Sequence, residues 1–434
     1  MATIIDSRDH NRYEVVKVSP LPAEPLNVVL SSGTAEKPTS QDAFGRLRFS
    51  TPLTLFDSSH RYRDNGLWDT DTATGGTAAF NANEGLVELS VTTTSGSRVY
   101  RETSKVFSYQ PGKSLLVLST FVLAPAKTNL RQRVGYFGTQ NGLYIELDGN
   151  TLSFVERSAV TGSITETRVN QANWNIDKLD GTGPSGFTLD IAKAQILWMD
   201  IEWLGLGTVR MGFVIDGKFI HCHSFNHANL ITSTYITTAS LPLRYEIENT
   251  GTTSTASTLK QVCSTVISEG GYELRGAQLA VSIPITTPVT LTTAGTYYPI
   301  LSVRLKSSPN RLDAVVIVTA LSLLGTSNNT VYNWQLRQGG TTTGGTWVSA
   351  GADSAVEYKI DGVGFTGGRI LASGYLSSTN QSAPSVNILK EALFTSQLER
   401  NTFTGTASEI TLVATASSGG ASFYGSLDFE EISR

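Results

Sequence analysis

Short runs in which apolar and polar residues alternate, separated by Gly, Asn, Asp and Pro, follow one another from about residue 51 onward. A period of two places successive side chains on opposite faces of a strand, so these runs predict strands with one buried face. In the first half of the chain, the expected strands are 86–92, 114–123, 132–137, 143–147, 152–157, 195–203, 209–215 and 218–224. In the second half, they are 278–283, 298–306, 314–324, 331–337, 355–360, 369–377, 409–416 and 423–432.

Turn residues divide these strands into two groups. Asp-Gly pairs at 148–149 and 216–217 each lie between two expected strands and predict tight hairpins, because such turns need positive φ. Residues 249–259 are almost wholly Thr, Ser, Gly and Ala, which favours an exposed loop. A Gly-rich turn at 269–276 follows soon afterwards. We therefore expect a domain boundary near residue 276.

The predicted fold is all-β: an extended N-terminal arm of residues 1–50, followed by two antiparallel β-sandwich domains of jelly-roll type at 51–275 and 276–434. The arm lacks a regular period, and its prolines prevent a continuous helix. It ends in the stretch 42–50, whose apolar side chains need a surface to lie on. The residues expected to anchor the arm to another subunit or to its own domain are Phe44, Arg46, Leu47, Arg48 and Phe49.

Composition supports the all-β interpretation. Thr and Ser supply 54 and 46 of the 434 residues, and the β-branched Thr packs well on a pleated surface. Charged residues make up only 16%, which excludes a coiled-coil or long-helix protein. The net charge is −4 and no long basic run occurs, so we expect no nucleic acid as a partner.

Other segments bear on where the protein is found. The N-terminus is polar and interrupted by charges, so we expect neither a signal peptide nor lipidation. The longest strongly apolar stretch, 312–324, contains an Asp, a Thr and a Ser and is too short for a bilayer, so we expect no membrane insertion. Cys222 and Cys263 are too few for a disulfide-stapled scaffold, and free thiols are favoured over a bridge.

Four stretches carry a resemblance to a known class of proteins. DAFGRLRFSTPLTLFD at 42–57, QPGKSL at 110–115, RQRVGYF at 131–137 and DKLDGTGPSG at 177–186 resemble stretches in virion structural proteins of tailed bacteriophages, especially aquatic phages and cyanophages. The resemblance covers roughly residues 40–250. It implies a component of the virion whose partners are other virion proteins, and it does not say which component.

Two serial β domains behind an extended arm suit a projecting appendage. We therefore expect a non-enzymatic part of the tail, a tail fibre or the baseplate, attached through the arm. A capsid decoration or head-fibre protein is the alternative, and so is a carbohydrate-binding receptor protein. Short strands with Thr-rich edges do not protect themselves against edge pairing, so we expect neighbouring subunits to cover them in a homo-oligomer, a trimer or larger.

A second resemblance concerns the fold of the first domain. Residues 195–205 and 209–221 are similar to a strand pair and Asp-Gly hairpin of concanavalin-like jelly rolls. The stretch WMDIEW at 198–203 is also similar to the catalytic strand of laminarinase-like glycoside hydrolases, in which three carboxylates alternate on one face. Here Asp200 and Glu202 occupy the second and third places, whereas the nucleophile's place is taken by Trp198.

This strand leaves three interpretations open. Residues two apart on a strand lie about 6.5–7 Å apart, within the roughly 5–9.5 Å that separates glycosidase carboxylates, so the spacing permits a hydrolase. Because the first carboxylate is missing, we expect no catalytic residue. A face that binds a host-surface glycan is the second interpretation, and an ordinary amphipathic strand is the third. The candidate carbohydrate-binding residues are Trp198, Asp200, Glu202 and Trp203.

Two stretches contain side chains of the kinds that bind metal ions. His221 and His223, two apart on an expected strand, would share a face, and His227 would join them from the following loop in a zinc-like cluster. A polar strand edge or a subunit contact explains the same residues without a metal. The loop 177–186 offers carboxylate and carbonyl oxygens to calcium, but a plain Gly-rich turn explains it as well. We expect no cofactor.

Overall fold

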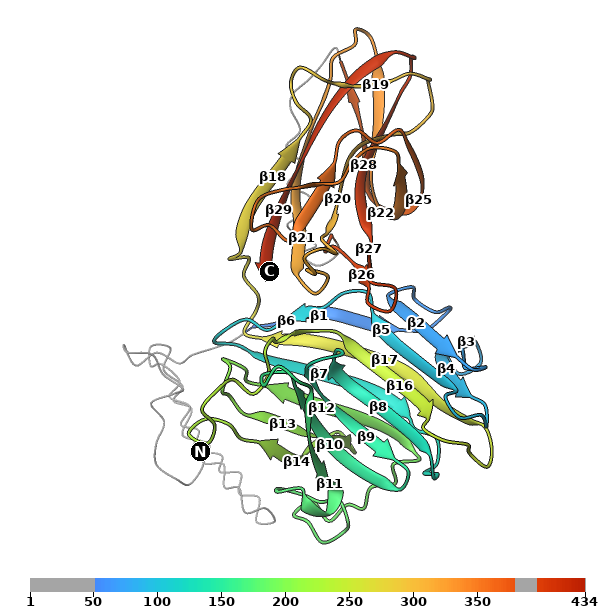
Figure 1. Cartoon of the computed structure of the whole chain (residues 1–434), viewed down its shortest axis with the longest axis vertical. Helices are drawn as coiled ribbons and strands as arrows, with labels where there is room; N and C mark the ends of the chain where they lie inside the picture. Colours follow the sequence, from blue (N-terminus) through green and yellow to red (C-terminus); the bar gives the residue numbers. More distant parts are fainter. Residues whose placement is uncertain (1–50, 379–395, 434) are drawn as a thin grey trace, which may run out of the picture. The chain divides into compact units, whose positions relative to one another are not determined.

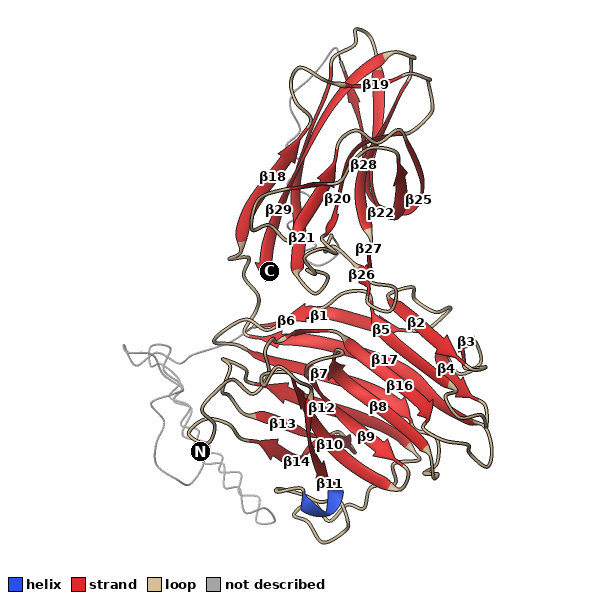
Figure 2. Ribbon diagram, viewed as in Figure 1, coloured by secondary structure: helices blue, strands red, loops and turns tan. Residues whose placement is uncertain are grey.

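The computed structural model describes residues 51–378 and 396–433, which belong to one compact unit. The expected anchoring residues Phe44, Arg46, Leu47, Arg48 and Phe49 lie outside the described residues. The described part is all-β, with strands paired antiparallel throughout and a single 3-10 turn, η1 (Gln171–Asn173) (Figure 2). Among these residues, no helix is long and apolar enough to cross a bilayer.

The first sandwich consists of two large sheets packed face to face (Figure 1). The eight-stranded sheet has the order β14 (Lys218–Phe225), β13 (Val209–Ile215), β12 (Ala194–Ile201), β7 (Ser114–Val122), β17 (Ser257–Glu269), β4 (Leu86–Val91) and β3 (Thr77–Asn81), with β1 (Pro52–Ser59) also paired to β17. The seven-stranded sheet has the order β11 (Thr165–Asn170), β10 (Thr151–Ser158), β9 (Gly142–Asp148), β8 (Leu130–Phe137), β16 (Leu243–Asn249), β5 (Arg98–Thr103) and β2 (Trp68–Ala73). A short pair, β6 (Phe107–Ser108) and β15 (Ser240–Leu241), lies beside them.

Alternation along each strand builds the core between the sheets. On β7, Leu115, Val117 and Phe121 are buried, while Leu116, Leu118 and Thr120 lie on the outer face of the eight-stranded sheet. From the opposite sheet, Phe154 enters the same core and stacks on Trp174 with ring centroids 4.3 Å apart. Burying such large side chains is the main favourable contribution to folding.

The second sandwich also has two sheets. The six-stranded sheet has the order β23 (Val348–Ser349), β24 (Val356–Lys359), β20 (Tyr298–Leu305), β28 (Glu409–Ala416), β22 (Val331–Thr343) and β25 (Gly364–Ser377). The four-stranded sheet is built around β29 (Ala421–Ser433), which pairs with β18 (Ala277–Ser282), β19 (Val289–Leu291) and β21 (Val315–Gly325). A small hairpin of β26 (Arg400–Asn401) and β27 (Thr406–Ala407) leads directly into β28 of the six-stranded sheet.

Residues 396–401 connect the second sandwich to the first. The Arg400 guanidinium lies 2.6 Å from the Glu102 carboxylate on β5, and both side chains are almost fully buried, at 2% and 1% exposure. The backbone N–H of Arg400 donates to the Ser104 carbonyl, and the Gln397 amide donates to the Val106 carbonyl, each at 2.9 Å. The contact therefore combines a buried ion pair with backbone hydrogen bonds.

The all-β prediction is confirmed, and every expected strand is present. Both Asp-Gly hairpins are confirmed as well; in the β13–β14 turn, Asp216 and Gly217 have φ of 51° and 73° between the paired residues Ile215 and Lys218. The expected loop at 249–259 is partly wrong, because β17 already begins at Ser257. The boundary near residue 276 stays a prediction.

Candidate functional site

The strand singled out by the sequence, β12, lies inside the eight-stranded sheet. Trp198 and Asp200 are on its outer face, because they alternate with the core residues Leu197 and Met199. Trp203, beyond the end of the strand, packs instead against the core, with its ring centroid 6.1 Å from that of Tyr109. The structure therefore brings Trp198 and Asp200 together and places Trp203 away from them.

The side chains of Trp198, Asp200 and Glu202 already have protein partners. The Trp198 indole is only 5% exposed; it lies over Gly212, where a Cβ would come 2.9 Å from Nε1, and donates to the Ile220 carbonyl. Asp200 forms an ion pair with Arg210 on the neighbouring strand β13. The exposed Glu202 accepts a hydrogen bond from the backbone N–H of Thr208 at 3.2 Å.

The exposed aromatic ring on this face is Phe219, which the sequence analysis did not select. Phe219 on β14 is 56% exposed, and its ring centroid lies 5.7 Å from that of Trp198 in an edge-to-face contact. Such a contact fixes ring orientation and contributes about 0.5–1.5 kcal/mol. The sequence did contain a signal for Phe219. This residue stands two positions after the Asp-Gly turn, which places its side chain on the same face as Trp198.

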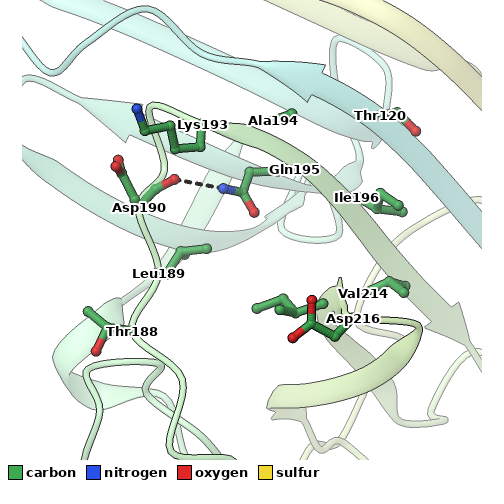
Figure 3. Close-up of a pocket in the computed structure, with 11 residues that line it drawn as sticks. Thr120, Thr188, Leu189, Asp190, Lys193, Ala194, Gln195, Ile196, Val214 and Asp216 are labelled. Carbon is green, nitrogen blue, oxygen red and sulfur yellow. Dashed lines mark hydrogen bonds between the residues drawn. The ribbon is translucent and has the colours of Figure 1, made fainter.

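A groove of about 450 Å³ lies where β12 begins and β13 ends (Figure 3). Phe219 is not one of its lining residues, but it pairs in register with Val214, which is. Residues of β7, β12 and β13 form the floor of the groove, and the segment 188–193 forms one wall. Lining side chains are both apolar and polar. The lining residues are Thr120, Thr188, Leu189, Asp190, Lys193, Ala194, Gln195, Ile196, Val214, Ile215 and Asp216.

The expectation that His221 and His223 share a strand face is wrong. A β-bulge in the β13–β14 pairing sets Met211 opposite His223 and Gly212 opposite His221, so the two imidazoles leave opposite faces of the sheet. His221 lies against Trp198 on the outer face, with ring centroids 5.8 Å apart. His223 lies inside, where its ring centroid is 4.6 Å from that of Phe225.

The third histidine, His227, forms hydrogen bonds with other groups of the protein. His227 is buried, with Nδ1 2.6 Å from the Gly207 carbonyl and Nε2 2.7 Å from the Glu156 carboxylate. Burial opposes protonation of the ring, but these two hydrogen bonds outweigh it and raise the pKa of His227. Within residues 51–378 and 396–433, no group of three or more His, Cys, Asp or Glu side chains could hold a metal ion.

The loop at 177–186 uses its carboxylates to bind its own backbone. The Asp177 carboxylate accepts from the N–H groups of Leu179 at 2.8 Å and Ser185 at 2.7 Å, and Asp180 accepts from the N–H of Thr182 at 2.9 Å. The contacts with Leu179 and Thr182 are Asx-type turns, and the contact with Ser185 closes the loop. Cys222 and Cys263 are both free thiols.

The outer face of the seven-stranded sheet carries a continuous row of ion pairs, buried except near Arg168 and Glu166, which the sequence analysis missed. Its members alternate along their strands with core residues such as Tyr245 and Ile247. Salt bridges join them one to the next across six strands, starting beside Arg400. In order, the row is Glu102, Arg244, Glu246, Arg133, Glu146, Arg168, Glu166 and Arg157.

Aromatic rings fill the spaces between these charges. The Arg133 and Arg157 guanidiniums lie 5.4 and 5.2 Å from the centre of the Tyr144 ring, and Arg157 also lies 5.5 Å from that of Phe137. Burial opposes ionisation of Glu166, but hydrogen bonds from Tyr144 and Arg157 outweigh it and lower its pKa to about 2. We name this set of charges and rings the ion-pair row; its carboxylates are each held by a guanidinium.

Asp69 on β2 lies next to the start of this row and makes the structure sensitive to pH. Burial raises the pKa of Asp69 to about 6, with neighbouring Glu399 and Glu102 adding to the shift against the attraction of Arg400. The protonated form therefore adds stability that is present below pH ~4, the pKa of an unfolded Asp, and lost as the pH rises through about 6.

Asp69→Asn is expected to remove this dependence, because an amide stays neutral at every pH. At pH 7.5 the free energy of unfolding of the variant should exceed that of the wild type by about 1–2 kcal/mol, a figure reduced because Asp69 is partly exposed. At pH 4 the two values should be equal. Urea denaturation at the two pH values measures the difference. Asp57→Asn, at an exposed position of β1, is the control and should change neither value. A difference that is the same at both pH values would contradict the assignment.

The sequence matches no described protein family and no curated protein. Several solved structures are similar at low identity. The CBM2 module of the evolved Dit of Lactobacillus casei BL23 phage J-1 is 5% identical, covers 52% of this chain and 100% of that chain, and gives a TM-score of 0.34. A carbohydrate esterase from the Shiga toxin-encoding bacteriophage phi24B is 13% identical, with coverage of 51% and 100% and a TM-score of 0.32. A GH16 protein of Bacteroides ovatus, solved with a product, is 8% identical, with coverage of 49% and 99% and a TM-score of 0.34.

Proposed function

We propose that this protein is a non-enzymatic structural component of a tailed-phage particle and forms part of an appendage, namely the tail, a tail fibre or the baseplate. In this proposal residues 1–50 attach the chain to other virion proteins, and the two sandwiches form the projecting body. The phage assignment is supported by the four stretches between residues 42 and 186 that resemble virion structural proteins.

The observation that carries the structural role is the buried connection between the sandwiches. An appendage has to transmit force between its domains, and a flexible linker alone does not do so. Arg400 bonds at once to the Glu102 carboxylate and to the Thr103 carbonyl, both at 2.6 Å. The Ser104 carbonyl accepts from the Arg400 backbone N–H and the Val106 carbonyl from the Gln397 side-chain amide, so the two sandwiches are held at several points and not only through the chain between them.

The state of the carboxylates supports a role without catalysis. A glycosidase needs one carboxylic acid that keeps its proton and a second carboxylate free to attack or to activate water. Asp200 is paired with Arg210, and the four glutamates of the ion-pair row are each bound by arginines. These residues stabilise the sandwich by mutual neutralisation.

The proposal is tested by quantitative mass spectrometry of purified phage particles encoded by the same genome as this chain. We expect peptides of the chain in the particle at several copies, in a ratio to the major capsid protein that survives a high-salt wash. If the chain forms a homo-oligomer, a trimer or larger, then the number of copies per particle should be a multiple of the number of subunits in one oligomer. Absence of the chain from washed particles would overturn the proposal.

A further inference from the structure

The groove where β12 begins and β13 ends has the surface chemistry of a site for a molecule with one apolar face and a polar edge. Across the outer face, register places Thr120 of β7 opposite Ile196 of β12, and Val214 of β13 opposite Phe219 of β14. Ile196 and Phe219 are 38% and 56% exposed, so an apolar strip remains open to solvent. Contiguous exposed apolar surface on a soluble protein marks an interaction site.

The rim of the groove supplies hydrogen-bonding groups of both kinds. Gln195 is 7% exposed, and its amide N–H donates to the Asp190 carbonyl at 2.7 Å, which fixes the side chain against the wall. In Figure 3 the Asp216 carboxylate points toward the open space opposite Leu189. Lys193 belongs to the same wall, but in Figure 3 its ammonium points away from this space. Convergent polar groups around an apolar floor are the usual composition of a small-ligand site.

We infer that this groove binds a neutral oligosaccharide, with the Phe219 ring stacked on the C–H face of one sugar and Asp216 bonding its hydroxyls. A pyranose presents an apolar face and a ring of hydroxyls that both donate and accept, which matches the floor and the rim. The carboxylates of Asp190 and Asp216 disfavour phosphate or sulfate groups, so an anionic polymer does not fit. The groove is open along the surface, so the chain of a longer glycan has room to continue past it.

In this arrangement Trp198 is a positioning residue. Its ring edge meets Phe219, and its indole is held flat over Gly212 by the hydrogen bond to Ile220. The sugar contacts Phe219, and Trp198 fixes the orientation of that ring. The inference goes beyond the structural role proposed above, because a groove can bind sugar wherever the chain lies in a particle.

The test uses the full chain and four defined probes, cellohexaose, laminarihexaose, maltohexaose and chitohexaose, in isothermal titration at up to about 5 mM, together with a glycan array. We expect at least one neutral glycan to bind with a Kd between roughly 10 μM and 1 mM. Phe219→Ala should weaken that binding about tenfold or more, and Asp216→Asn by about three- to tenfold. Because Phe219 is more than half exposed, its removal should leave the circular dichroism spectrum and the melting temperature close to those of the wild type.

Tyr375→Ala is the matched control, since this tyrosine is 77% exposed on β25 of the second sandwich, and it should bind as the wild type does. Binding to none of the four probes and to no neutral glycan on the array would overturn the inference. Wild-type affinity in a folded Phe219→Ala variant would overturn it too. Neither result bears on the presence of the chain in particles, so the two proposals fail separately.

Discussion

Arg400→Ala is expected to lower the free energy of unfolding by about 3–5 kcal/mol, because it leaves the buried Glu102 carboxylate with one guanidinium where it had two. The variant also loses the hydrogen bond to the Thr103 carbonyl. Two measurements check this expectation. Urea denaturation gives the loss of stability, and limited proteolysis should show faster cleavage at 270–276, where the chain passes from one sandwich to the other.

Arg275→Ala controls for the loss of an arginine as such. Its side chain is 78% exposed and pairs only at the surface with Glu273, so its removal should change stability by less than about 0.5 kcal/mol. A double-mutant cycle of Glu102→Gln with Arg400→Met isolates the energy of the pair. If Arg400→Ala loses under about 1 kcal/mol and proteolysis is unchanged, the sandwiches are not held together by this contact.

Arg133→Met should be almost as damaging at neutral pH, with a loss of about 3–5 kcal/mol. Arg133 lies at the middle of the ion-pair row, 2.7 Å from the Glu146 carboxylate and 3.2 Å from that of Glu246, with a side chain only 8% exposed. Methionine still packs against the Tyr144 ring, but the two buried carboxylates lose the positive charge of the Arg133 guanidinium. The pKa of Glu146 in the folded variant then rises relative to the wild type, so the stability that this carboxylate contributes falls most at neutral pH and least at low pH.

The loss in Arg133→Met should therefore be largest near pH 7 and smallest near pH 4, and thermal denaturation across this range measures it. In the wild type, Glu146 contributes the opposite trend in the same range. Burial disfavours ionised Glu146, but hydrogen bonds from Arg168 and Arg133 outweigh it and lower its pKa, so its stabilisation is present above pH ~4.3 and lost on acidification. Arg131→Met on the same strand, where the pair with Glu248 is partly exposed, should cost only about 1 kcal/mol. Equal losses in the two variants would contradict a special role for the buried row.

Period-two patterning predicted the strands well where one face is apolar and the other is exposed. β16 was missed although Leu243, Tyr245 and Ile247 alternate with charged residues. Its charged face is buried too, through ion pairs with strands that are distant in sequence. A pattern within one strand shows that Arg244 and Glu246 share a face, but not that Arg133 and Glu102 lie across from them.

The sequence predicted the candidate site only in part, because the contacts that decide it also lie between strands. A β-bulge changes which face a residue occupies and leaves no mark in the spacing of His221 and His223. Trp198 and Asp200 were correctly placed on one strand face, but their burial depends on Gly212 and Arg210 of the next strand. The pairing of Glu102 with Arg400 joins residues 298 positions apart, and no local pattern reports such a contact.

Cryo-electron microscopy of intact particles tests the central claim most directly, by showing where this chain lies and what residues 1–50 contact. The account predicts density for both sandwiches on the tail, a tail fibre or the baseplate, with the N-terminal arm bound to another virion protein. Density on the capsid shell would contradict the appendage assignment. Particles that lack the chain altogether would contradict the structural role.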